Sequence, residues 1–370
     1  MPLHRTIARK ARVRLTRPRL SGRTSPPTPL SGAVVWIFGS VEAEMAHRIG
    51  RTGTSGKRRE AARRAAARSE APRVSLYEEV TATIIAQLET GVFPWVQPRS
   101  AAAAGVGLPR NAVTGRPYSG INVLILWGAV IEGGYTAQDW LTFRQALAAG
   151  GCVRKGERGR TISYADRFTP KNDTGHEQVS PQPDEAARSI RFLKRFTVFN
   201  VAQCDGLPER FTAEPAPFSE HQPHRAAEEL IAACGADFRV GGTEAYYSPI
   251  GDYVQVPPQT AFAQPQDYYD VALHELGHWT GHKSRLGRDQ TGGHQTPAYA
   301  REELCAELSA AFLCATLGIA PSVRHADYLG YWLAVLRADN RAIFKAASQA
   351  SKAADFLLAF TDALPLEAAA

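Results

Sequence analysis

The stretch YYDVALHELGHWTGHKSRLG, residues 268–287, contains two histidines four residues apart. On an α-helix, positions i and i+4 lie on one face about a turn apart, so His274 and His278 can bind one metal ion together. Glu275 follows the first histidine, where its carboxylate can take a proton from an attacking water molecule without being a ligand. The spacing His-Glu-x-x-His therefore predicts a zinc peptidase centre with Glu275 as general base.

The flanking residues predict that this stretch is helical. Asp267 is placed to cap the start of a helix, and Gly281 is a natural stop. Between them, apolar residues recur at helical spacing: Tyr268, Val271, Ala272, Leu276 and Trp279. A core helix whose histidines are satisfied without a metal is the alternative interpretation.

Catalytic zinc takes three protein ligands, so a third has to come from elsewhere in the chain. Ser284 stands where the third histidine of an extended HExxH motif would be. The following stretch YAREELCAELSAAFLCATLG (299–318) has apolar residues at helical spacing and carries several glutamates. We expect Glu303 to be the third ligand and Glu307, one turn further on, to orient a ligand histidine. Glu302 points about 100° away and is less favoured.

Two further histidines and a predicted hairpin lie close to the motif. His282 continues the helical face, where an interaction with the helix C-terminus is favoured over metal binding. His294, in the loop TGGHQTP, could steady a developing negative charge. The segment EAYYSPIGDYVQVP (244–257) alternates around a turn and predicts a hairpin, whose edge could hold an extended peptide.

Positive charge is concentrated at the start of the chain. Residues 1–73 hold 17 Lys and Arg against 4 Asp and Glu, residues 74–212 hold 15 against 13, and residues 213–370 hold 11 against 19. The first stretch cannot support a core, so we expect a disordered basic arm. Translation from Met45 would remove 8 of its basic residues, so the first 44 residues either lie outside the working protein or add non-specific phosphate binding.

Membrane insertion and disulfide bonding are both disfavoured. The apolar run GAVVWIFG (32–39) is too short to cross a bilayer, and its long basic lead is unlike a secretory signal. The 5 cysteines are scattered and form no Cys-x-x-Cys pair. These features predict a cytoplasmic protein without membrane contacts.

The remaining chain is expected to form two folded domains, residues 74–212 and 213–370, of the α+β class. In the first, the patterns predict a helix over 75–91, an apolar helix over 121–131, a capped helix from Thr136, and strands over 160–168 and 195–204. The second contains the HExxH helix and the glutamate-bearing helix.

Basic residues of the first domain stand beside aromatic ones. Cations that meet phosphates next to aromatic rings that stack bases are typical of single-stranded nucleic-acid binding. Aromatic residues are more often part of a core, so this signal is weak by itself. The candidate contacts are Arg110, Arg116, Tyr118, Arg154, Lys155, Arg158, Arg160, Arg191, Lys194 and Arg195.

From Ser75 to about Leu317, the chain resembles ArdC-type antirestriction proteins of conjugative plasmids, whose N-terminal domain also occurs in TraC-type plasmid primases. The likeness is carried by GVFPW, NAVTGRPYSGIN, VRKGERG, FTVFNVAQCDGL, HELGHWTGHKSRLGRD and YAREELCAELSAAFL. It implies an N-terminal domain that binds single-stranded DNA and a C-terminal zincin-like metallopeptidase domain with Zn²⁺. His274, Glu275 and His278 match the family's motif directly, and Glu303 matches its third ligand.

The resemblance also implies a biological role. Such a protein would protect mobile DNA from host restriction during conjugative transfer, with single-stranded DNA and a host or plasmid protein as partners. Two alternatives stay open. The zinc could be purely structural in a DNA-binding protein, or the chain could be a regulatory peptidase of the ImmA type that cleaves a repressor.

Overall fold

The computed structural model describes residues 75–96, 107–168, 190–211, 222–294, 296–320 and 328–362. The predictions for residues 1–73, including the basic arm and the Met45 start, lie outside the described residues. The described chain mixes helices with strands, which confirms the predicted α+β class. Within this part of the chain, every helix is too short or too polar to cross a bilayer.

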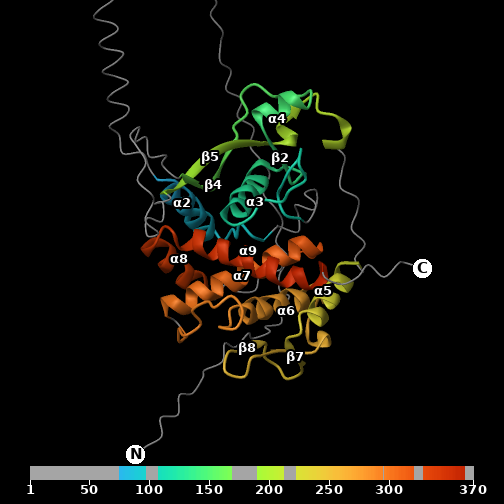
Figure 1. Cartoon of the computed structure of the whole chain (residues 1–370), viewed down its shortest axis with the longest axis vertical. Helices are drawn as coiled ribbons and strands as arrows, with labels where there is room; N and C mark the ends of the chain where they lie inside the picture. Colours follow the sequence, from blue (N-terminus) through green and yellow to red (C-terminus); the bar gives the residue numbers. More distant parts are fainter. Residues whose placement is uncertain are drawn as a thin grey trace, which may run out of the picture. The chain divides into compact units, whose positions relative to one another are not determined.

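The N-terminal segment, defined here as the described residues between 75 and 211, is built around one sheet (Figure 1). The sheet has the strand order β1-β2-β5-β4, in which β1 and β2 run parallel and the other pairs antiparallel. Its elements are α2 (Leu76–Glu89), β1 (Arg110–Asn111), α3 (Ile121–Gly133), β2 (Asp139–Thr142), α4 (Phe143–Ala148), β3 (Cys152–Val153), β4 (Arg160–Phe168), β5 (Ile190–Asn200) and β6 (Cys204–Asp205). β3 and β6 form a separate two-stranded sheet.

The helix predicted from Thr136 is wrong, because Thr136 lies in a bend and strand β2 follows at Asp139–Thr142. Trp140 and Leu141 are both fully buried, one in each of the two hydrophobic clusters of the segment. A strand points adjacent side chains to opposite faces, so it can bury both residues at once. The helix α4 begins only after Thr142, whose side chain accepts a hydrogen bond from the backbone N–H of Gln145.

The C-terminal segment, defined here as the described residues between 222 and 362, is mainly helical. Its small sheet has the order β7-β9-β8, so β8 is an edge strand, and β8 with β9 forms the predicted hairpin. Its elements are α5 (Gln222–Ala233), β7 (Asp237–Val240), β8 (Tyr246–Ser248), β9 (Tyr253–Val256), α6 (Pro265–Thr280), α7 (Pro297–Leu317), α8 (Leu329–Ala338) and α9 (Ala342–Asp362).

The two helices predicted to carry the metal ligands are α6 and α7, which pack against each other. Gln264 rather than Asp267 precedes the first turn of α6, and Gly281 ends the helix as expected. A Cβ added at Gly277 would lie 3.3 Å from the Cα and carbonyl oxygen of Ala306 on α7. Glycine at this position therefore allows the close approach that brings the glutamates of α7 to the histidines of α6.

The two segments share one hydrophobic core. Trp127 of α3 meets Phe312 of α7 edge to face, with ring centroids 5.7 Å apart. The hydroxyl of Ser351 on α9 accepts a hydrogen bond from the backbone N–H of Gly120 at 2.8 Å. Figure 1 shows α9 between α7 and the elements of the N-terminal segment, and α9 packs against both α3 and α7. The domain boundary near residue 212 stays a prediction, since Leu76 onwards belongs to one compact unit.

Candidate metal centre and nucleic-acid interface

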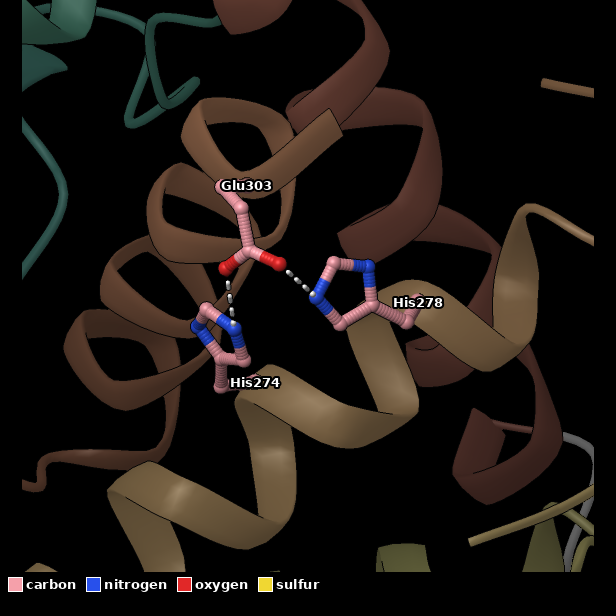
Figure 2. A group of neighbouring side chains, drawn as sticks. All are labelled: His274, His278 and Glu303. Atoms are coloured by element: carbon pink, nitrogen blue, oxygen red, sulfur yellow. Dashed lines mark ion pairs between the residues drawn. The ribbon is translucent and has the colours of Figure 1, made fainter. Parts of the chain in front are cut away.

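Three side chains from α6 and α7 converge on one point, as Figure 2 shows. Glu303 lies between the two imidazoles, with its carboxylate oxygens 3.5 Å from Nε2 of His274 and 3.5 Å from Nε2 of His278. One donor atom from each residue falls within 4.8 Å of the other two. Among the described residues, these three form the group of His, Cys, Asp or Glu side chains that lie close enough together to hold a metal ion.

The donor set fits a small divalent cation. The two 3.5 Å separations involve different oxygens of Glu303, Oε2 at His274 and Oε1 at His278, so one carboxylate faces both imidazoles at once. Two imidazole nitrogens and one carboxylate suit zinc, and a fourth position would stay open for water or substrate. Glu275 is also buried on α6, between the two histidines in sequence.

Each histidine has its own carboxylate on the ring nitrogen that faces away from Glu303. Nδ1 of His274 lies 3.5 Å from Glu307, and Nδ1 of His278 lies 3.2 Å from Glu302. A carboxylate at this nitrogen fixes the ring orientation and leaves Nε2 available for a metal. The orienting role expected for Glu307 is compatible with this arrangement, and Glu302 has the corresponding position at His278.

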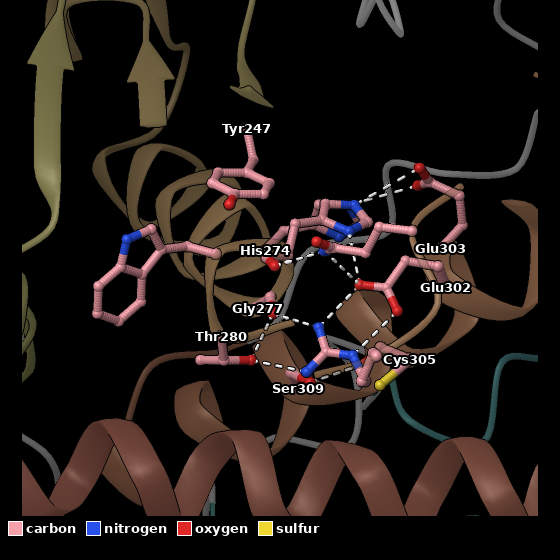
Figure 3. A network of polar contacts seen from close by, with 12 residues as sticks. Tyr247, His274, Gly277, Thr280, Glu302, Glu303, Cys305 and Ser309 are labelled. Atoms are coloured by element: carbon pink, nitrogen blue, oxygen red, sulfur yellow. Dashed lines mark hydrogen bonds and ion pairs between the residues drawn. The ribbon is translucent and has the colours of Figure 1, made fainter. Parts of the chain in front are cut away.

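Sequence reasoning missed this role of Glu302. Arg288 donates to both oxygens of Glu302, at 2.8 and 2.9 Å, and to the carbonyl oxygen of Gly277 at 2.6 Å (Figure 3). Gln290 adds a hydrogen bond to Glu302 at 3.1 Å. Arg288 and Gln290 lie in the loop between α6 and α7, and nothing in the stretch HKSRLGRDQ singles them out as partners of Glu302.

The buried charges of the centre shift one another's protonation. Burial by itself lowers the pKa of His278, but Glu303 and Glu302 outweigh it and raise the pKa to about 9. His274 shows the same balance, and Glu303 with Glu307 raises its pKa well above the usual range. The histidines in turn hold the pKa of Glu303 well below its usual value despite burial. The metal-free centre is therefore an ion-pair cluster.

The two other histidines lie apart from this cluster. Nδ1 of His282 is 2.7 Å from the hydroxyl of Ser284, at the end of α6. The ring of His294 lies against Tyr299, with centroids 5.4 Å apart, and the Tyr299 hydroxyl is 3.2 Å from that of Tyr328. Burial, together with the neighbouring Glu303, raises the pKa of Tyr299, so its hydroxyl stays protonated beside the centre.

A second candidate site is a cavity of about 510 Å³ on the sheet of the N-terminal segment. Alternate residues of β4 and β5 point to one face, so Tyr164 and Phe196 both line this cavity. They are 56% and 42% exposed, and their rings meet edge to face. Exposed rings beside a cavity are what base stacking requires.

The predicted DNA contacts divide into two groups. Arg116, Tyr118 and Lys194 line the same cavity, although Tyr118 is only 7% exposed. The others do not line it. Arg110, Arg154, Arg160 and Arg195 pair with carboxylates, Lys155 and Arg158 are exposed in the turn between β3 and β4, and the side chain of Arg191 lies outside the described residues. Their role in DNA binding stays a prediction.

Known proteins match this chain in both segments. Residues 74–199 match the family model of the N-terminal domain of anti-restriction factor ArdC, and residues 225–349 match that of a zincin-like metallopeptidase. The metal-free crystal structure of antirestriction ArdC protein from plasmid R388 is 40% identical in sequence. The match has a TM-score of 0.65 and covers 78% of this chain and 98% of that one.

The chain belongs to the ArdC antirestriction protein family. An uncharacterized protein of Sinorhizobium fredii, y4eC, is 39% identical over 285 residues, which cover 76% of this chain and 91% of that protein. DNA primase TraC of Escherichia coli is 37% identical over 294 residues, but the match covers only 27% of the primase. The expected family resemblance is thereby confirmed, and the primase shares only a part of its length with this ArdC-family protein.

The relatives also bear on the metal. A Mn(II)-bound structure of the R388 ArdC protein matches with a TM-score of 0.63 and 38% identity, covering 78% of this chain and 99% of that one. In this ArdC-family chain, His274, His278 and Glu303 are the residues that would hold a metal ion. The donor set suits zinc, and the identity of the metal stays a proposal.

The free energy of unfolding of the metal-free protein is expected to fall as the pH rises from about 6.5 to about 9. His278 has a folded pKa of about 9 against an ordinary 6.5, so its stabilising charge is fully present below 6.5 and lost as the pH passes 9. The loss should amount to up to about 3 kcal/mol. Thermal unfolding in EDTA across this pH range measures it.

Two controls separate this effect from general alkaline destabilisation. His278→Gln should reduce the pH dependence, because one of the two imidazoles with a raised pKa is gone. Saturating Zn²⁺ should also remove the decline, since a metal binds neutral imidazoles. A melting temperature in EDTA that rises over the same range would contradict the expectation.

Proposed function

We propose that this protein binds single-stranded DNA through the N-terminal segment and carries a zinc peptidase centre in the C-terminal segment. The observation that carries the proposal is the convergence of His274, His278 and Glu303, with a separate carboxylate behind each histidine. Membership of the ArdC family supports an antirestriction role for mobile DNA. Action during conjugative transfer, in the cytoplasm, belongs to the same proposal.

The cavity on the sheet supports the DNA-binding part. Tyr164 and Phe196 offer two exposed rings for bases, while Arg116 and Lys194 place cations at the same cavity for phosphates. Stacking on a ring is tolerant of base identity because every base has a π-face. Such a groove is suited to single strands, whose bases are accessible, rather than to a paired duplex.

Replacing Tyr164 or Phe196 with Ala is expected to weaken binding of a dye-labelled oligo(dT) by about 5- to 150-fold, because stacking contributes about 1–3 kcal/mol per base. Fluorescence anisotropy measures the affinity. Ile250→Ala is the matched control, since Ile250 is 92% exposed on the C-terminal segment. Equal affinities of Tyr164→Ala, Phe196→Ala and Ile250→Ala would remove this cavity from the DNA site.

Salt dependence tests the charged part of the same cavity. Lys194→Ala should reduce the slope of log affinity against log salt by about 0.7, the value for one phosphate contact on a single strand. Arg225→Ala is the control, because Arg225 is an exposed arginine of the C-terminal segment. A comparison of chains that begin at residues 1 and 74 shows whether the basic N-terminus contributes the affinity instead.

The C-terminal segment supports peptide hydrolysis through its own residues. A metal ion held by the three donors would supply Lewis acidity for a peptide carbonyl. Glu275 is the residue that would take the proton of the attacking water and later donate it to the leaving amine. Glu302 and Glu307 would keep both imidazoles in place while this occurs.

The peptide substrate proposed for this centre is a host or plasmid protein near the bound strand. Binding of the transferred strand by the N-terminal segment would bring the peptidase close to proteins that act on that strand. A purely structural metal is the alternative, and the effect of Glu275→Gln decides between the two. A regulatory peptidase of the ImmA type would be favoured if the full chain had no affinity for single-stranded DNA.

A further inference from the structure

Trp95 of the N-terminal segment reaches the metal centre. Nε1 of Trp95 donates a hydrogen bond to Oε1 of Glu307 at 3.3 Å. The other oxygen of the same carboxylate lies 3.5 Å from Nδ1 of His274. Glu307 therefore stands between the indole of one segment and a ligand histidine of the other.

Trp95 is held rigidly in this position. Its side chain is 1% exposed, and its ring meets Phe93 and Trp332 edge to face with centroids 5.8 Å away in each case. Glu307 is only 8% exposed. A hydrogen bond between two buried, packed groups fixes the direction of the carboxylate more firmly than one at the surface.

The two carboxylates behind the histidines have different partners. Glu302 receives two hydrogen bonds from the guanidinium of Arg288, whose positive charge neutralises it. Glu307 receives a hydrogen bond from the neutral indole N–H of Trp95, which orients the carboxylate. A carboxylate held at Nδ1 of His274 in this way fixes the orientation of the ring and leaves Nε2 available for the metal site.

We infer that Trp95 is a positioning residue for the metal centre and acts through Glu307 on His274. The N-terminal segment thus completes the site that the C-terminal segment carries. This inference rests on the proposed metal centre. It assigns to the tryptophan of the GVFPW stretch a role in metal affinity, beyond its place in the core shared by the two segments.

The test is the zinc affinity of the full chain at pH 7, measured by competition with a chromogenic chelator. Trp95→Phe keeps an aromatic ring but removes the donor, and it should weaken zinc binding by about 3- to 10-fold. Glu307→Gln should weaken it by about 10- to 100-fold, as is usual for carboxylates that orient a ligand histidine.

Trp332→Phe is the matched control for packing. Trp332 is fully buried against Trp95, and its Nε1 has no hydrogen-bond partner among the residues that the structure describes. This variant loses the same ring volume without losing a bond to the centre, so its zinc affinity should change by less than about 2-fold. If Trp332→Phe and Trp95→Phe weakened zinc binding equally, packing would explain the effect and the inference would be overturned.

A double-mutant cycle shows whether Trp95 acts through Glu307. In the Glu307→Gln protein, the further change Trp95→Phe should alter zinc affinity by less than about 2-fold, because the two residues belong to one chain of contacts. Fully additive effects would overturn the inference, as would wild-type affinity in Trp95→Phe.

Failure of the metal centre itself would look different. His274→Ala should abolish measurable zinc binding if the proposed site is correct. If His274→Ala bound zinc as tightly as the wild type, the proposed centre would be wrong, and Trp95 would have no site to position. If His274→Ala lost zinc binding but Trp95→Phe bound zinc as tightly as the wild type, the metal centre would stand and only the positioning role of Trp95 would be contradicted.

Discussion

Zinc affinity should fall by more than about 100-fold in Glu303→Gln, because removing even a carboxylate that only orients a ligand costs about 10- to 100-fold. Glu303 faces both imidazoles at 3.5 Å, so it is the group on which the two helices converge. A neutral amide can still offer an oxygen, but it lacks the charge that balances the cation. Chelator competition on the full chain measures the change.

Glu303→Gln also has a second effect, which partly offsets the loss of zinc affinity and depends on pH. Without this carboxylate the pKa values of the two histidines should fall, so protons compete less with the metal. The loss of zinc affinity in Glu303→Gln, relative to the wild type, should therefore be somewhat larger at pH 9 than at pH 7. Glu229→Gln, an exposed glutamate on α5 paired with Arg225, is the control. Equal zinc affinities of the two variants would show that Glu303 is no ligand.

Peptide hydrolysis should fall by about 10²- to 10⁴-fold in Glu275→Gln, the range that a general base contributes. Zinc affinity should change by less than about 3-fold, because Glu275 lies outside the group of ligand atoms. The combination of intact metal and lost turnover separates a catalytic carboxylate from a ligand. Cleavage of dye-labelled casein by the zinc-loaded protein measures turnover, with Glu229→Gln as the control.

The same substitution decides between a catalytic and a structural metal in the cell. Under the peptidase proposal, Glu275→Gln should lower the survival of a transferred plasmid in a restricting recipient to the level seen without the protein. Survival at the wild-type level would favour protection by occlusion of the strand. The Tyr164→Ala variant serves as the comparison that weakens DNA binding but leaves the metal centre intact.

Local patterns predicted most of the elements that carry the sites. The strand over 160–168 agrees with β4, because alternation of side chains is a property of the strand itself. The helix with HELGH also follows from local spacing and its terminal glycine. The wrong helix prediction at Thr136 arose because local patterns do not decide the structure there. Whether the residues from Asp139 onwards form a strand depended on partners that bury Trp140 and Leu141 from two sides.

The sequence could not show that Tyr164 and Phe196 lie together at the cavity on the sheet. Tyr164 and Phe196 resemble the many aromatic residues that pack in a core, and only the register of β4 with β5 places both beside one cavity. Tyr118 shows the opposite case: its arginine neighbour predicted a contact with DNA, but its side chain is almost fully buried. Exposure is decided by what covers a face of the sheet, which is a long-range property.

The sequence by itself determined the chemistry of the centre: two imidazoles one helical turn apart, a carboxylate between them, and glutamates on a later helix. Tertiary structure decided which glutamate faces which nitrogen, and it brought Arg288 to Glu302 and Trp95 to Glu307. The reason is that helical spacing fixes directions only within one helix. The packing of α6 on α7, allowed by Gly277, fixes distances between residues that are far apart in the chain.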